Sequence, residues 1–420
     1  MKYKAIRGME DILPGRTPAW QALEKTARKI FESYGYSEIR TPVIEETQVF
    51  VRSIGETSDI VAKEMYTFKD RKDRSLTLRP EGTAPVVRSF IEHALDKLSA
   101  ETKLYYMGPM FRSERPQKGR SRQFHQIGVE VMGTDSPYAE AEVIIQLDRL
   151  LRDFGLSGFT LKLNSLGCKK DKEAFKVKLE NFLRDKKARL CEDCKIRLKK
   201  NVLRVLDCKK DPCRNLTREA PAAPDSLCSD CRERYGKTKE ILKAVKVPFV
   251  EVKNLVRGLD YYTGTVFEIT HDKLGGQDAI AAGGRYDSLV KDMGGRDVPA
   301  VGYALGMERV LIALGEKIKP PEKKVVYIVT LGDKAKIEGF RVAETLRKES
   351  GISVLTDTKE ASLKSQMRTA DKAGAEISVI IGENELREKK ALVRDMKTAE
   401  QREVSLEQVA GEVSRRVNGK

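Results

Sequence analysis

Two segments of alternating polarity flank a short basic loop, and this pattern constrains the fold more than any other stretch of the chain. The segments lie within Met110–Gly133, and the loop between them, Arg115–Arg122, contains four cations and no acid. The pattern predicts two antiparallel strands joined by a hairpin. Because side chains alternate between the two faces of a strand, one face of the hairpin should be largely polar. That face carries Met110, Arg112, Glu114, Phe124, Gln126, Gly128 and Glu130, and Gly128 should leave room on it for a ligand.

The polar face has the groups that a nucleotide requires. An arginine can bind a phosphate, an aromatic ring can stack on a base, and carboxylates can accept hydrogen bonds from cationic groups. The alternative is a solvated sheet face beside a charged surface loop. Two facing strands with polar residues in step, and a loop with one sign of charge, favour the binding surface.

Composition limits the possible classes of protein. The chain of 420 residues has a formal net charge of +16, which favours polyanionic partners. No apolar run reaches the length of a membrane span, and the first residues contain no signal-like apolar region, so a cytoplasmic location is expected. The three histidines form no His-x-x-x-His pair, which excludes the usual zinc hydrolase sites.

Two further stretches place polar residues at the ends of regular elements. Arg79–Pro85 reads RPEGTAP and precedes a predicted helix, so Glu81 and Thr83 lie at the helix start. Both residues can cap the helix, or they can accept hydrogen bonds from the ammonium group of a ligand. Arg257–Glu268 reads RGLDYYTGTVFE and leads into a β-branched strand. Its tyrosines fit either a buried hairpin or a binding pocket.

A strand rich in small residues leads into a helix near Arg309. Val301–Arg309 reads VGYALGMER, and Gly302, Ala304 and Gly306 would let a flat ligand approach the backbone. Arg309 lies in the first turn of the helix, where amide donors and the helix dipole already favour anions.

The chain divides at a charged linker. Glu316–Lys324 reads EKIKPPEKK, and the sequence pattern differs on its two sides. Residues 1–320 are predicted to form an α+β domain built on an antiparallel sheet, with a mainly helical insertion at about 168–235 that stands off the sheet. Residues 325–420 alternate strands and helices, which predicts a small α/β domain.

Six of the seven cysteines lie close together in the insertion. The first two and the last two each form a Cys-x-x-Cys pair, which is a common pattern for zinc. The spacing between these pairs is longer than in compact zinc ribbons, so a cluster of reduced, partly buried thiols is the alternative. The six are Cys191, Cys194, Cys208, Cys213, Cys228 and Cys231.

The wording of these motifs resembles one family. The hairpin resembles motif 2 of the class II aminoacyl-tRNA synthetases, and PMFRSERPQKGRSRQFHQIGVEVMG looks like the histidyl-tRNA synthetases in particular. RGLDYYTGTVFE is similar to the peptide that sets the histidyl enzymes apart from other class II members. The helix and strand that end at Pro42 resemble motif 1, and the segment around Arg309 resembles motif 3. The resemblance covers nearly the whole chain, in order.

The resemblance implies ATP-dependent activation of histidine, with Mg2+ accompanying ATP, and transfer of the histidyl group to tRNA(His). By the roles known in that family, Arg112 and Arg257 would hold the α-phosphate and are the expected catalytic residues. The expected ATP site comprises Arg112, Glu114, Phe124, Arg257 and Arg309. The expected histidine site comprises Glu81, Gly82, Thr83, Gln126, Glu130, Tyr261 and Tyr262.

The resemblance also implies partners. The C-terminal domain would bind the anticodon, two copies would form a homodimer, and the hairpin loop would contact the acceptor end of the tRNA. The loop residues expected to do so are Arg115, Lys118, Arg120 and Arg122. The family does not require a metal in the insertion, so a structural Zn2+ there remains an open expectation.

Two synthetase-like proteins without the full reaction are the functional alternatives. One is a regulatory subunit of histidine biosynthesis, which usually lacks the C-terminal domain and has an eroded histidine peptide. The other is a sensor that binds uncharged tRNA without catalysis. This chain has the C-terminal domain, the histidine peptide and the three arginines Arg112, Arg257 and Arg309, which favours the enzyme.

Overall fold

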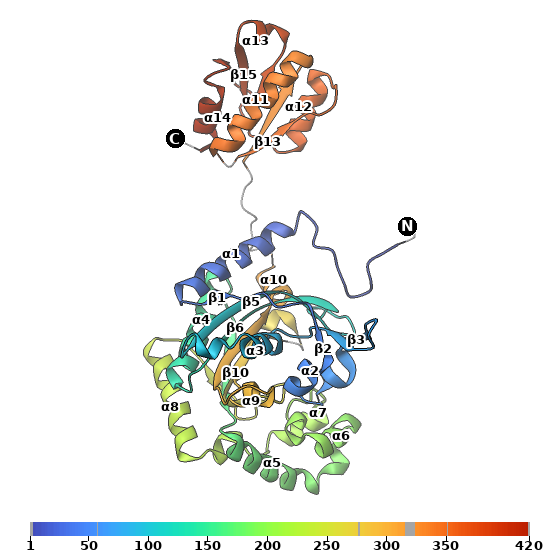
Figure 1. Cartoon of the computed structure of the whole chain (residues 1–420), viewed down its shortest axis with the longest axis vertical. Helices are drawn as coiled ribbons and strands as arrows, with labels where there is room; N and C mark the ends of the chain where they lie inside the picture. The colour runs from blue at the N-terminus through green and yellow to red at the C-terminus, as the bar shows by residue number, and fades with distance from the viewer. Residues whose placement is uncertain (1–2, 57, 276–277, 316–323, 351, 419–420) are drawn as a thin grey trace. The chain divides into compact units, whose positions relative to one another are not determined.

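The chain forms two compact units, residues 1–320 and residues 321–420. The computed structural model describes residues 3–56, 58–275, 278–315, 324–350 and 352–418, and Figure 1 traces them. The expected linker Glu316–Lys324 lies outside the described residues, except for Lys324. Among the described helices, none is both long and apolar enough to cross a bilayer.

The first unit is organised around an eight-stranded sheet with the order β1-β5-β6-β11-β10-β9-β7-β8. The six central strands pair antiparallel, and the two edge strands pair parallel with their neighbours. The expectation of an antiparallel sheet is therefore confirmed for the centre of the domain. The strands are β1 (Ser37–Glu38), β5 (Thr102–Phe111), β6 (Gln123–Met132), β7 (Thr160–Ser165), β8 (Val250–Glu251), β9 (Thr263–Thr270), β10 (Ala279–Arg285) and β11 (Ala300–Gly306).

Alternation along β6 separates the core from the site. Ile127, Val129 and Val131 are buried, and they belong to the core that also contains the inward residues of α1 (Thr17–Ser33) and α4 (Pro137–Asp153). Because these apolar residues alternate with polar ones, the second face of the strand is free for a binding site. The core also receives residues of α10 (Met307–Leu314).

The second face of the sheet is covered by helices that frame the site. The helix α3 (Thr83–Glu92) packs its apolar side on this face, and a small sheet precedes it in the chain. That sheet has the order β2-β4-β3. The remaining elements here are β2 (Ile44–Glu46), α2 (Thr47–Ile54), β3 (Tyr66–Lys69), β4 (Ser75–Leu78) and α9 (Leu289–Asp292). Figure 1 shows α3 in front of the large sheet, with α2 beside it.

The insertion is mainly helical, as expected, but it does not stand off the sheet. Its last helix continues to Ala244 and packs on α4, where the Thr238 hydroxyl donates to Glu140 over 3.2 Å. Residues 207–210 line the same cavity as the sheet residues, which corrects the expectation of a detached module. Its helices are α5 (Lys169–Arg184), α6 (Glu192–Lys200), α7 (Asp211–Thr217) and α8 (Ser229–Ala244).

The second unit has a five-stranded mixed sheet with the order β13-β12-β14-β15-β16. Three strands are parallel and two are antiparallel additions at one edge. All side chains of Ile377–Ile381 are buried, which fits a central parallel strand covered on both faces. Its elements are β12 (Val325–Thr330), α11 (Asp333–Ser350), β13 (Ser353–Thr356), α12 (Leu363–Lys372), β14 (Ile377–Ile381), α13 (Glu383–Arg387), β15 (Lys390–Asp395), β16 (Gln401–Ser405) and α14 (Val409–Asn418).

Candidate active site

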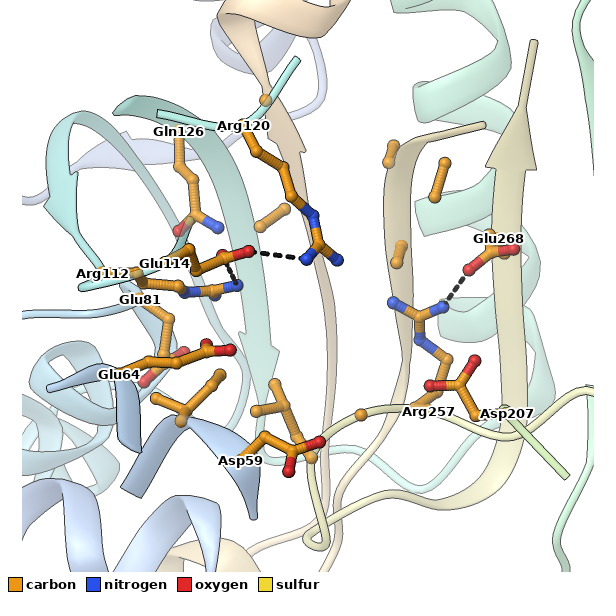
Figure 2. A pocket seen from close by; sticks show the side chains of 18 of the residues that line it. Asp59, Glu64, Glu81, Arg112, Glu114, Arg120, Gln126, Asp207, Arg257 and Glu268 are labelled. Atoms are coloured by element: carbon orange, nitrogen blue, oxygen red, sulfur yellow. Dashed lines mark hydrogen bonds and ion pairs between the residues drawn. The ribbon is translucent and has the colours of Figure 1, made fainter. Parts of the chain in front are cut away.

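Three arginines that are far apart in the chain line one cavity of about 550 Å3. Arg112 follows β5, Arg257 lies between β8 and β9, and Arg309 is in the first turn of α10. Figure 2 shows Arg112 and Arg257 reaching into the cavity from opposite walls. The cavity therefore presents positive charge from two sides, an arrangement suited to a phosphate.

The hairpin forms one wall of this cavity. Glu130, Gln126 and Phe124 project into it from β6, in the alternation expected from the sequence. Met110 differs from the expectation, because it is fully buried opposite Phe124 and does not line the cavity. The space expected over Gly128 is filled: a Cβ there would lie 2.4 Å from the hydroxyl oxygen of Tyr106, so the tyrosine ring occupies it.

Arg112 is held in place by backbone and by an aromatic ring. Its Nε donates to the Pro80 carbonyl over 2.9 Å, and its guanidinium lies 5.1 Å from the centre of the Phe124 ring. Glu114 stands next to it and forms an ion pair with Arg120 at 2.7 Å (Figure 2). Of the four loop cations expected to contact tRNA, only Arg120 lines the cavity among the described residues.

Arg309 links the hairpin loop to α10, the helix on which Arg309 lies. Its Nε donates to the Gly119 carbonyl over 2.8 Å, and a terminal nitrogen donates to the Ala279 carbonyl over 2.6 Å. Burial lowers the pKa of Arg309 below its ordinary value. On the opposite wall, Arg257 forms an ion pair with Glu268. Burial opposes the charge on Arg257, but the carboxylate of Glu268 outweighs it and the pKa of Arg257 rises.

Glu130 is the most deeply buried acid of the cavity, with 1% of its surface exposed. The Thr83 hydroxyl donates to its Oε1 over 2.7 Å, and the Tyr286 hydroxyl donates to its Oε2. Burial raises the pKa of Glu130 to about 8. Gly302 lies directly opposite on β11, where a Cβ would be 1.9 Å from Glu130 Oε2, so only glycine fits there.

Glu81 caps its own helix, as one of the two sequence interpretations held. Its carboxylate accepts hydrogen bonds from the backbone amides of Thr83 and Ala84, each over 2.8 Å. Burial raises the pKa of Glu81, and its side chain still lines the cavity. Gly82 does not line the cavity, and a Cβ there would be 2.1 Å from the Tyr106 ring. Gly82 therefore acts through packing.

The two tyrosines of the RGLDYYTG peptide complete this end. The Tyr261 and Tyr262 rings are 4.7 Å apart, both are buried, and both line the cavity. Burial raises the pKa of Tyr262 to about 12, so its hydroxyl keeps its proton and can donate. Gln126 offers an acceptor beside them, because its buried Oε1 has no hydrogen-bond partner among the described residues.

Sequence reasoning missed several residues that hold the site together. Tyr286 follows β10 directly, and nothing in the sequence around it marked it as a partner of Glu130. Lys172, in the insertion, donates to the carbonyls of Asp260 and Tyr262 over 2.8 Å each. Burial lowers the pKa of Lys172 to about 8. Such long-range contacts have no local sequence signal.

The insertion also forms ion pairs at the opposite rim of the cavity. Arg197 and Arg204 both pair with Asp59, with distances of 3.0 and 3.2 Å to the same carboxylate oxygen.

The cysteines form two separate groups, Cys191–Cys194–Cys208–Cys213 and Cys168–Asp171–Cys228–Cys231. The two Cys-x-x-Cys pairs therefore belong to different groups, and Cys168, which the sequence analysis left aside, joins the second.

An antiparallel sheet that carries a basic hairpin, and three arginines around a cavity with a buried acid, agree with the resemblance to the class II aminoacyl-tRNA synthetases. The model of the family described as histidyl-tRNA synthetase matches residues 8–310, and that of an anticodon binding domain matches residues 325–416. The chain belongs to the histidyl-tRNA synthetase family.

Individual relatives support the same assignment over the full length. Histidine–tRNA ligase of Thermosipho melanesiensis is 47% identical over 97% of this chain and 98% of the relative. Histidine–tRNA ligase of Thermotoga maritima is 47% identical, with 100% of both chains covered. The crystal structure of apo histidyl-tRNA synthetase from S. aureus matches with a TM-score of 0.83 and 36% identity, covering 98% of this chain and 100% of that one.

Proposed function

We propose that the cavity joins histidine to ATP and then passes the histidyl group to tRNA(His). In the first step a histidine carboxylate oxygen bonds to the α-phosphorus of Mg2+-bound ATP, and pyrophosphate leaves. In the second step a terminal ribose hydroxyl of the tRNA bonds to the acyl carbon, and AMP leaves. Full-length relatives named histidine–tRNA ligase support this reaction.

The observation that carries the proposal is the approach of Arg112 and Arg257 from opposite walls of one cavity. Attack on the α-phosphorus needs little proton transfer, so positioning and charge stabilisation dominate. The two guanidinium groups bind the α-phosphate from opposite sides. Arg257 is paired with Glu268 and Arg112 rests on Phe124, so both are held close to where the phosphate enters.

The adenine end of the nucleotide lies against the hairpin. Phe124 and Arg309 enclose the ring, Glu114 accepts a hydrogen bond from the adenine amino group, and Arg309 also reaches toward the terminal phosphate. Glu114 is held beside Arg112 by its ion pair with Arg120. The Gly119 carbonyl accepts a hydrogen bond from Arg309, so the hairpin loop lies against this arginine.

The histidine end is selective because its polar groups are buried. Glu130 and Tyr262 bind the two imidazole nitrogens, one as acceptor and one as donor, and Tyr261 lines the same pocket. An amino acid that cannot satisfy both groups would leave a buried polar group unpaired, which costs several powers of ten in specificity. The substrate ammonium is bound by Glu81, Thr83 and the unpaired Oε1 of Gln126.

The remaining assignments rest on the family rather than on the cavity. The hairpin loop cations contact the tRNA acceptor end, and the domain at 325–420 binds the anticodon, in line with the domain model matched there. The protein functions as a cytoplasmic homodimer. A structural Zn2+ in the insertion rests instead on its two groups of cysteines. The regulatory and sensor alternatives gain no support, because relatives that match over the full length are named histidine–tRNA ligase.

The deciding experiment is ATP–pyrophosphate exchange with each of the twenty amino acids in turn. Exchange with histidine alone is the expected result. If histidine and ATP both bind but no exchange occurs, the chain is a binding protein and the proposal fails. Exchange driven by another amino acid would contradict the roles of Glu130 and Tyr262.

A further inference from the structure

The insertion gathers all seven cysteines of the chain into two compact groups. All seven are free thiols. Within each group, four potential ligand atoms lie within 4.8 Å of one another. One group has four sulfurs, and the other has three sulfurs and one carboxylate oxygen. Both combinations of ligand atoms match donor sets of zinc.

The first group has the dimensions of a tetrahedral site. Cys191 Sγ and Cys208 Sγ are 3.9 Å apart. Four sulfurs at the usual Zn–S distance of about 2.3 Å form a tetrahedron with edges of about 3.8 Å. The backbone amide of Cys191 donates to Cys213 Sγ over 3.3 Å, and such donors stabilise a thiolate. The four cysteines follow the pattern Cys-x2-Cys-x13-Cys-x4-Cys, which is a compact spacing. This spacing is not visible when the two Cys-x-x-Cys motifs are assumed to bind the same ion.

The second group is built where two long helices begin. Cys168 and Asp171 stand at the start of α5, and Cys228 and Cys231 at the start of α8. The Cys168 amide donates to Cys231 Sγ over 3.2 Å, and the Cys228 amide donates to an Asp171 oxygen over 3.1 Å. The groups from both helices are therefore already joined by hydrogen bonds, and each helix start favours negative charge on its thiols.

We propose that the insertion binds two zinc ions, one through Cys191, Cys194, Cys208 and Cys213, and one through Cys168, Asp171, Cys228 and Cys231. Thiolates select zinc over hard cations such as Mg2+ and Ca2+. Four protein ligands close each coordination sphere, which is the signature of a structural rather than a catalytic ion. Neither ion takes part in the ligation reaction.

The two ions have one structural purpose, to fix the insertion against the histidine pocket. Lys172 is the residue after Asp171 of the second site, and its ammonium group donates hydrogen bonds to the carbonyls of Asp260 and Tyr262. Asn201 follows α6 of the first site and donates to the Asp260 carboxylate over 2.7 Å. Loss of zinc would loosen both clamps on the tyrosine peptide, so the KM for histidine should rise more than kcat falls.

The first test is the zinc content of the full chain, purified under reducing conditions and measured by elemental analysis. The expected value is two ions per chain. A zinc-free protein with seven reactive thiols overturns the proposal. In the expected case a thiol reagent reacts slowly until a chelator is added, and two zinc ions are then released as the seven thiols become reactive.

Variants separate the two sites. Cys194→Ser with Cys213→Ser should remove one ion, Cys228→Ser with Cys231→Ser should remove the other, and Asp230→Asn should keep both because Asp230 lies exposed outside the group. Loss of the same single ion from both double variants would overturn the division into two sites. One ion per chain, lost only from the first double variant, would overturn the second site. The wild-type measurement stands even if a variant fails to fold.

Zinc content is independent of the ligation reaction. A chain that catalyses exchange but holds no zinc refutes only the zinc sites, and a zinc-loaded chain without exchange refutes only the proposed activity.

Discussion

Replacing Glu130 by glutamine tests the buried acid of the histidine pocket. The substitution keeps the size of the side chain and makes it neutral at every pH. The Thr83 and Tyr286 hydroxyls can rotate, so that one donates to the new carbonyl oxygen and the other accepts from the new amide nitrogen. Both hydroxyls therefore keep a hydrogen-bond partner, and the variant should fold.

The pKa of Glu130 sets the size of the stability effect. Below pH 4.5 the acid is protonated in both the folded and the unfolded chain. Between pH 4.5 and about 8 only the folded chain keeps the proton, so stability falls as the pH rises. At about 1.4 kcal/mol for each pKa unit, the full loss above pH 8 is at most about 5 kcal/mol. The glutamine variant lacks this loss, so its unfolding midpoint should rise relative to wild type between pH 5 and pH 8.5.

Ligand binding should respond in the opposite sense. Above pH 8, where Glu130 is ionised, imidazole loses a charge-assisted hydrogen bond worth about 1.5–3 kcal/mol, which predicts histidine binding weaker by roughly 10- to 100-fold at that pH. ATP affinity should not change. Glu114→Gln is the matched control, because it should weaken ATP and leave histidine unchanged. Isothermal calorimetry with each ligand measures both. Equal losses for histidine and ATP in Glu130→Gln, or a wild-type pH dependence of stability, would refute the assignment of Glu130.

Further substitutions address the other walls. Arg257→Ala should lower pyrophosphate exchange by more than about 100-fold while circular dichroism shows a folded protein, because a transition-state donor is lost; exchange at the wild-type rate would remove Arg257 from catalysis. Gly302→Ala should lower the unfolding midpoint and raise the KM for histidine, since its Cβ would lie 2.3 Å from the Val129 carbonyl oxygen and 1.9 Å from Glu130 Oε2; an unchanged midpoint with an unchanged histidine KM would contradict these contacts. Lys172→Met should raise the KM for histidine several-fold by releasing the carbonyls of Asp260 and Tyr262, and equal changes in both KM values would argue against this clamp.

Sequence patterns were reliable where the structure depends on near neighbours. Alternation along Phe124–Val131 correctly divided the strand into an apolar face and a cavity face, because a strand has a period of two residues wherever it packs. Glu81 was placed at a helix start, where its carboxylate caps backbone amides. The insertion was recognised as helical from its local composition, but its contact with the cavity was not foreseen.

Contacts between distant parts of the chain could be recognised only from the three-dimensional structure. Tyr286 lies 156 residues from Glu130 in sequence, and Lys172 lies 90 from Tyr262. The empty space expected over Gly128 is filled by Tyr106 from the neighbouring strand, which follows from strand register rather than from residue type. Such pairings depend on how elements pack, and a local pattern does not encode them.

The sequence alone determined the faces of the strands, the order of the motifs and the family, because periodicity and motif wording are properties of contiguous residues. Only the tertiary structure decided which cysteines meet, which wall each arginine occupies and which hydroxyls hold the buried acid. The reason is physical: the energies that fix these partners arise when burial brings remote side chains into contact and removes them from water.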